Sequence, residues 1–166
     1  KKKRKSDDYT PGGMNNRRPD RALIVYANLI RQYSTTKKPI VLGGIEASLR
    51  RFAHYDYWQD RVRQSVLADA PADLLVFGMG ERQVCEIAGR LDEGEPVEEL
   101  RDISGTTYTL EISAWRSLSR KNIVEIPSFS IVSSDTTAYA RAFALQYAEQ
   151  DPVRGRAVAQ PHPKTV

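Results

Sequence analysis

The residues best suited to ligand chemistry form two glycine turns, each followed by a glutamate. Gly43-Gly44 precedes Glu46, and Gly78-Met79-Gly80 precedes Glu81. Glycine permits positive φ and close approach of the backbone to a ligand, and free N–H groups at the start of a following helix can hold an anion. Each glutamate could face a ribose or other hydroxyl, or could simply favour the first turn of a helix. The candidate cofactor-binding residues are therefore Gly43, Gly44, Glu46, Gly78, Gly80 and Glu81.

These turns match neither common nucleotide-binding motif. Gly80 is followed by Glu81-Arg82-Gln83, so the Gly-x-Gly-x-x-Gly of dinucleotide-binding folds is absent. The sequence also has no Gly-x-x-x-x-Gly-Lys-Ser/Thr, which excludes ordinary P-loop chemistry.

The other reactive side chains form no known catalytic or metal-binding pattern. One cysteine, Cys85, excludes an internal disulfide framework, a cysteine-based zinc site and a self-contained iron–sulfur cluster. We expect Cys85 to be a half-buried structural thiol, His54 to be partly buried in an aromatic segment, and His162 to be exposed. The sequence therefore offers no catalytic residue and no metal ligand.

An arginine- and aromatic-rich segment between Arg50 and Arg63 leaves several interpretations open. Arginines interleaved with aromatic rings can neutralise and stack on single-stranded nucleic acid. A packed amphipathic helix with solvated arginines, or a contact surface between domains, would produce the same pattern. The residues concerned are Arg50, Arg51, Arg61 and Arg63, with Tyr55, Tyr57 and Trp58.

The glycine turns must be positioned by the elements before and after them. Ile40–Leu42 and residues 72–77 are short apolar runs without alternation, which is typical of strands buried on both faces. Ligands of such parallel sheets bind beyond the carboxyl ends of the strands. We predict a helix from Pro19 to about Tyr33, mostly helix over residues 45–69, and a helix after Gly80. The expected apolar faces are Ala22, Tyr26, Leu29, Ile30 and Tyr33; Trp58, Val62 and Val66; and Val84, Ile87, Ala88 and Leu91.

The second half of the chain is less regular. We predict a short strand over residues 103–109, a strand broken by Pro127 over residues 123–131, and a last helix capped by Ser134 or Asp135. An aromatic stripe on that helix, Tyr139, Phe143 and Tyr147, is interpreted as packing. Residues 1–18 are expected to form a flexible arm, and residues 151–166 a tail or linker.

Length and charge suit one soluble α/β domain with tails. The chain has 166 residues and a formal charge of +4, but Lys1–Lys5 alone carry five positive charges. The remainder is close to neutral, which argues against a uniformly basic nucleic-acid-binding surface. No apolar run approaches the ~18 residues of a membrane span, and no signal peptide is evident, so we expect a cytoplasmic protein. A first residue other than methionine suggests a fragment.

Several motifs together resemble the YgiQ-type radical SAM proteins. The resemblance extends along most of the chain and weakens after Ile126. It is specific as a combination, although no single motif would suffice. The motifs are Lys5–Gly13, Arg18–Ala22, Gly43–Arg51, His54–Trp58 and Gly78–Arg82.

This resemblance implies an enzyme that cleaves S-adenosylmethionine reductively at a [4Fe-4S] cluster. The matching region lies upstream of the radical SAM barrel and is similar to a cobalamin-binding-like domain over residues 19–150. The implied fold is a Rossmann-like or flavodoxin-like three-layer α/β sandwich with a mostly parallel sheet, here incomplete. Residues 151–166 would then lead toward the barrel.

Two motifs of such enzymes are absent from this chain. Neither the Cys-x-x-x-Cys-x-x-Cys that binds the cluster nor the Asp-x-His-x-x-Gly that ligates cobalt is present. The cluster and S-adenosylmethionine are therefore expected outside this chain, bound by a barrel of the same polypeptide, and cobalamin binding stays open. The resemblance makes the candidate residues positions that line a cofactor or an interdomain edge. The alternatives are a stand-alone module for single-stranded RNA or a nucleotide-like ligand, using the Arg50–Arg63 surface, and a structural scaffold.

Overall fold

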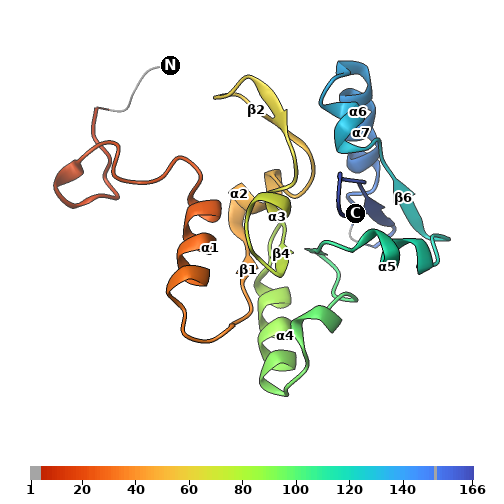
Figure 1. Cartoon of the computed structure of the whole chain (residues 1–166), viewed down its shortest axis with the longest axis horizontal. Coiled ribbons are helices and arrows are strands. Elements are labelled where there is room, and N and C mark those ends of the chain that lie inside the picture. Colours follow the sequence, from red (N-terminus) through yellow and green to blue (C-terminus); the bar gives the residue numbers. More distant parts are fainter. Residues whose placement is uncertain (1–4, 152) are drawn as a thin grey trace.

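The computed structural model describes residues 5–151 and 153–166, and these form three small sheets with helices packed on them (Figure 1). Lys1–Arg4, most of the lysine-rich run, lie outside the described residues. The central sheet has the strand order β1-β4-β5, with β1 parallel to β4 and β5 antiparallel to it. Its elements are β1 (Val41–Leu42), α2 (Gly44–Leu49), α3 (Val66–Asp69), β4 (Leu74–Val76), α4 (Glu81–Asp92) and β5 (Thr106–Thr107), preceded by α1 (Ala22–Tyr33).

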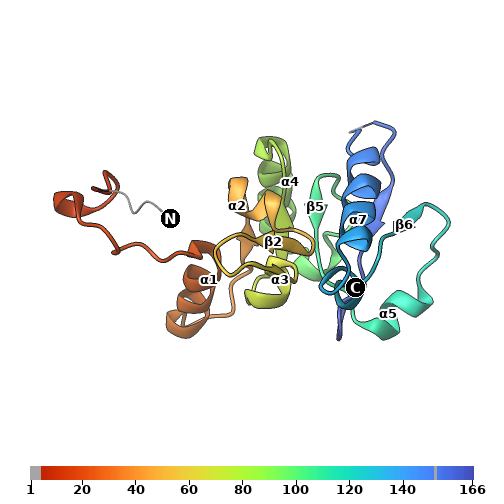
Figure 2. The same ribbon diagram turned by 90° about the horizontal axis from the view of Figure 1, so that it is seen from above.

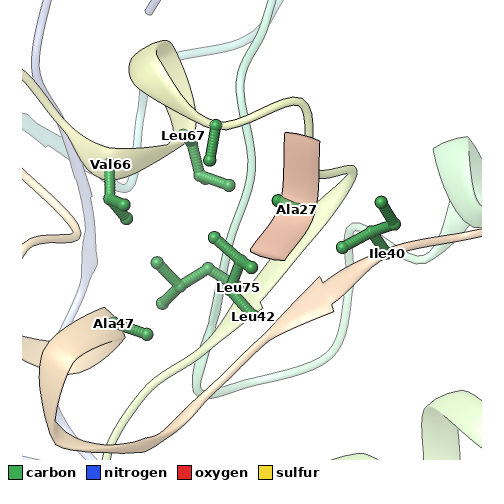
Figure 3. Packing of buried hydrophobic residues seen from close by; sticks show 8 residues of the cluster. Ala27, Ile40, Leu42, Ala47, Val66, Leu67 and Leu75 are labelled. Atoms are coloured by element: carbon green, nitrogen blue, oxygen red, sulfur yellow. The ribbon is translucent and has the colours of Figure 1, made fainter. Parts of the chain in front are cut away.

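Helices cover both faces of this central sheet. On one face Leu42 and Leu75 pack with Ala27 of α1, Ala47 of α2 and Leu67 of α3 (Figure 3). On the other face the neighbouring residues of β4 pack with Ile87 of α4. All three residues of β4 are buried because successive side chains of a strand point to opposite faces. The α/β fold predicted from the apolar runs is confirmed.

The segment predicted to be mostly helical over residues 45–69 contains a β-hairpin. β2 (His54–Asp56) pairs antiparallel with β3 (Arg61–Arg63), between the short helices α2 and α3. Asp56 Oδ1 accepts the N–H groups of Trp58 and Gln59, and Asp60 has a positive φ of 52°. This turn chemistry overrides the spacing of four between the apolar residues that suggested a helix.

The C-terminal part forms a second small unit beside the hairpin (Figure 2). Its elements are α5 (Ile112–Ser117), β6 (Ile123–Glu125), α6 (Phe129–Val132), α7 (Thr136–Ala148) and β7 (Ala157–Ala159). β6 pairs parallel with β7, and the buried side chain of Gln160 accepts the N–H of Ala53 at 2.7 Å. Residues 157–159, predicted to belong to a tail or linker, form a strand of the fold. Asp135 caps α7, as predicted.

Two helices expose the faces that the sequence assigns to the core. The partly buried or buried side of α1 is Leu23, Ile24 and Ala27, whereas Tyr26 and Tyr33 are exposed. α1 is apolar nearly all round, so periodicity alone could not select its buried face. On α7, Tyr139 is half-buried but Phe143 and Tyr147 stack on each other in solvent, at 6.2 Å between ring centroids.

The N-terminal arm extends away from the central sheet in both views and contains a closed loop (Figure 1 and Figure 2). The loop includes a 3₁₀ turn, Pro11–Gly13. Elsewhere in the chain, another 3₁₀ turn, Val97–Glu99, follows α4. Asp7 is buried within the arm, and its carboxylate accepts two hydrogen bonds from Arg18 at 2.7 and 2.9 Å. Residues 7–18 are therefore held together by their own hydrogen bonds.

Candidate functional site

A groove of about 660 Å³ lies where the carboxyl ends of β1 and β4 meet the first turns of α4. Five of the six candidate residues line it, and both glycine turns contribute to its wall. The parallel pairing of β1 with β4 brings the two turns to the same edge of the sheet. The lining consists of Gly43, Gly44, Gly78, Gly80 and Glu81, with Val41, Leu42, Val76, Val84, Ile87, Ala88 and Leu91.

Three of the four turn glycines are required, for two different reasons. Gly44 and Gly78 have φ values of 83° and 73°, which L-residues rarely adopt. A Cβ at Gly80 would overlap the side chain of Val76. Gly43 has an extended φ of −155°, and no atom lies within 4 Å of the position that a Cβ would take there. The bare backbone of Gly43 therefore faces open space.

Gly78→Ala is expected to lower the free energy of unfolding by about 1 kcal/mol, because alanine is strained at positive φ. Gly43→Ala is the matched control, since it adds the same methyl group without strain or contact. Urea denaturation of both variants measures the difference. Equal stabilities would contradict the backbone geometry of the second turn.

The two candidate glutamates lie in different surroundings. Glu81 is exposed at the start of α4 and lines the groove. Glu46 is half-buried, and its Oε1 accepts a hydrogen bond from Arg50 Nη1 at 2.7 Å, one turn further along α2. Glu46 is not among the groove-lining residues, so the structure joins Glu81 to the glycine turns and leaves Glu46 in a local ion pair.

Val84 and Ala88 have a different role from the one their spacing predicts. The spacing assigns both to the buried face of the helix after Gly80, but both are exposed and line the groove. Ile87 and Leu91 do pack against the sheet. The apolar side of α4 is therefore wider than its contact with the sheet. The apolar residues that do not contact the sheet, Val84 and Ala88, form part of one wall of the groove.

The groove supplies shape and apolar surface rather than reactive groups. Apart from Glu81, its lining side chains are aliphatic. The described residues contain no group of three or more His, Cys, Asp or Glu that could hold a metal ion. Cys85 is exposed on α4, contrary to the expected half-buried thiol. The chain therefore does not fit an iron–sulfur cluster, which needs several thiolates.

Both histidines lie away from the groove. His54 is partly buried as predicted, and its Nδ1 lies 3.1 Å from the carbonyl oxygen of Phe52. Burial lowers the pKa of His54 below its usual range. His162, expected to be exposed, is half-buried and stacks on Phe129 at 5.7 Å between ring centroids. Neither ring lines the groove as a ligand for a cobalt ion.

Two of the four arginines of the Arg50–Arg63 segment are paired with carboxylates. Arg50 pairs with Glu46 at 2.7 Å and Arg63 pairs with Asp69 at 2.5 Å. Arg61 is exposed and donates to the side chain of Gln59. Since acidic partners neutralise two of the four arginines, the structure gives no support to the RNA-binding alternative.

Sequence reasoning groups Arg51 with the other arginines of its segment and misses its position beside the glycine turns. Its Nη1 donates to the carbonyl oxygen of Ser48, and its guanidinium lies 4.9 Å from the centre of the Phe77 ring. Ser48 Oγ in turn accepts the N–H of Gly78 at 3.1 Å, which ties α2 to the second turn. No local motif indicates these contacts, because α2 and the end of β4 are separated by the whole hairpin.

In the part of the chain that the structure describes, no helix is long and apolar enough to cross a membrane. No solved structure matches the chain. Among curated proteins, the chain is 50% identical to a UPF0313 protein of Methanosarcina acetivorans, with 99% of the chain and 25% of that protein aligned. It is 52% identical to one from Methanocella arvoryzae, over 100% of the chain and 27% of the relative. For one from Clostridium botulinum the identity is 48%, over 98% and 24%.

The chain thus spans about a quarter of the length of the curated relatives that it matches. The family model described as Radical SAM N-terminal matches residues 1–166. The apolar groove and the glycine turns therefore lie in a member of the Radical SAM N-terminal family.

Proposed function

We propose that the chain is the ancillary N-terminal domain of a radical SAM enzyme and is not catalytic alone. The [4Fe-4S] cluster and S-adenosylmethionine bind outside it, in a barrel of the same polypeptide, and the reaction is reductive cleavage of S-adenosylmethionine. The family match supports this assignment. An enzyme with such a cluster suits a reducing compartment, the cytoplasm.

The feature of this chain that supports the proposal is the groove at the carboxyl ends of β1 and β4. Gly43, Gly44, Gly78 and Gly80 keep its wall free of side chains, and aliphatic residues of α4 form the opposite wall. In our proposal this surface orients the cofactor or substrate held by the catalytic domain. The cluster, when bound, supplies the electron, and residues of this chain only position and shield.

The test is anaerobic reconstitution of the full-length protein with iron and sulfide. We expect the visible absorption of a [4Fe-4S] cluster, followed by formation of 5′-deoxyadenosine and methionine when S-adenosylmethionine and a reductant are added. A full-length protein that takes up no cluster and consumes no S-adenosylmethionine would contradict the proposed function and favour a scaffold.

A further inference from the structure

Arg51 is unusual among the arginines of residues 5–151 and 153–166. Six of these arginines are shielded from solvent to an intermediate degree, and five of the six pair with a carboxylate at 2.5–2.7 Å. Arg51 is the sixth, and within the described chain it has no carboxylate partner. A charged group that is partly removed from water is normally paired. The paired five are Arg21, Arg31, Arg50, Arg63 and Arg90.

The surroundings of Arg51 are aromatic rather than acidic. Its guanidinium lies 5.5 Å from the centre of the Phe52 ring and 4.9 Å from that of Phe77. Burial lowers the pKa of Arg51. Among the described residues its hydrogen-bond acceptor is one carbonyl oxygen, that of Ser48. Five N–H donors in a planar fork suit a carboxylate, and most of them are left for such a partner.

Large apolar side chains are exposed on α2, which precedes Arg51, and on the second glycine turn, which follows Phe77. Ile45 and Leu49, one turn apart on α2, are 80% and 72% exposed, and Met79 of the second glycine turn is 86% exposed. The hydrogen bond from Gly78 to Ser48 holds α2 against that turn. We call Ile45, Leu49 and Met79 the apolar rim. Exposed large apolar residues, with methionine and arginine among them, are typical of protein–protein interfaces.

The missing carboxylate does not belong to a ligand of the groove. Phe77, on which Arg51 lies, packs with the cluster of α1, α2 and α3, whereas the preceding Val76 lines the groove on the side of α4. Arg51 itself is not a groove residue. Curated relatives are about four times as long as the part that matches this chain, so a further domain of the polypeptide is available to cover this edge.

We infer that the apolar rim is the surface on which the radical SAM domain of the same polypeptide docks, and that Arg51 is its charged anchor, receiving a carboxylate from that domain. This inference rests on the proposed function. In this inference the groove, next to α4, binds the cofactor or substrate. The rim, next to α2, contacts the other domain. Docking there would hold both glycine turns against the catalytic domain.

Hydroxyl-radical footprinting of the full-length protein, read by mass spectrometry, tests the inference without any substitution. Met79 is more exposed than Met14 in this chain, at 86% against 49%. Oxidation follows exposure, so an undocked rim predicts that Met79 is oxidised faster than Met14. Each oxidation rate is divided by the rate of the same methionine in denaturant. We expect the normalised rate of Met79 to be at least about threefold lower than that of Met14.

Arg51→Gln is expected to restore rapid oxidation of Met79, at least about threefold over the wild type, because the anchor is lost. Arg51→Lys keeps the charge and should keep partial protection. The matched control is Arg141→Gln, at an exposed position of α7 without an ion pair in the described chain. Protection of Met79 that survives Arg51→Gln would overturn the role of Arg51 as anchor.

The remaining outcomes separate the possible occupants. Faster oxidation of Met79 than of Met14 overturns docking on the rim. Protection that requires added S-adenosylmethionine, or that is lost on dilution, overturns the domain as occupant and assigns the rim to a small ligand or to a second copy. Cluster absorption and S-adenosylmethionine cleavage are measured on the same sample. An active protein with an exposed Met79 refutes the docking alone, whereas absence of the cluster refutes the proposed function.

Discussion

Replacing Gly43 with leucine is expected to lower kcat/KM for S-adenosylmethionine cleavage by the full-length protein roughly 100-fold. Gly43 has an extended backbone and no atom within 4 Å of the position its Cβ would take. The Cβ of a leucine therefore fits without a clash, and the rest of the side chain adds volume to the groove. A group displaced by about 1 Å can reduce a rate by about 100-fold when the groove orients it.

Gly89→Leu is the matched control for this substitution. Gly89 lies within α4, has no atom within 4 Å of its Cβ position, and does not line the groove. We expect its activity to stay within about twofold of the wild type. Cluster absorption should be the same in both variants, because the chain supplies no cluster ligand. Equal activities of the two variants would contradict a role of the groove in orienting a ligand.

Sequence alone could predict those features of the site that depend on residues adjacent in the chain. A run such as Leu74–Val76 followed by Gly78 indicates a buried strand and a tight turn without knowledge of its neighbours. Two such units predict that their turns meet at one edge if the strands are parallel, and β1 and β4 are parallel. The positions of Gly43, Gly44, Gly78, Gly80 and Glu81 at the groove follow from this reasoning.

The rest depends on contacts between distant segments. Arg51 is distinguished by Phe77 and by the absence of an acidic neighbour in the described chain, and neither is visible in Leu49-Arg50-Arg51-Phe52. The hairpin turn depends on Asp56, whose carboxylate competes with helix formation through local hydrogen bonds. The face of α1 that is buried is decided by the packing of Ala27 against the sheet.

Asp56→Ala is expected to lower the free energy of unfolding by about 3 kcal/mol, because it breaks an ion pair whose carboxylate is buried and whose guanidinium is partly buried. The side chain of Asp56 is buried, and its Oδ2 accepts a hydrogen bond from Arg21 Nη2 at 2.5 Å. Its Oδ1 accepts the N–H groups of Trp58 and Gln59. Truncation leaves Arg21 without this carboxylate and removes the acceptor that closes the hairpin turn. Urea denaturation followed by tryptophan fluorescence measures the loss.

Asp102→Ala is the control, since Asp102 is also paired with an arginine but its side chain is 72% exposed. An exposed ion pair contributes roughly 0–1 kcal/mol. A loss for Asp56→Ala no larger than that for Asp102→Ala would contradict the role of the buried pair.

The effect of Asp56 should also depend on pH in a defined direction. The hydrogen bond from Arg21, assisted by the two backbone N–H groups, lowers the pKa of Asp56 from 3.8 to about 2. A carboxyl whose pKa is depressed by folding stabilises the fold above its unfolded pKa and loses that contribution as the pH falls through its folded pKa.

The difference in the free energy of unfolding between wild type and Asp56→Ala should therefore be constant above about pH 5 and shrink between pH 4 and about pH 2. Because Arg21 immediately precedes α1 and Asp56 ends β2, this loss would remove a contact that joins the hairpin to the start of the helix. A pH-independent difference would instead mean that Asp56 acts through its shape and backbone hydrogen bonds rather than through its charge.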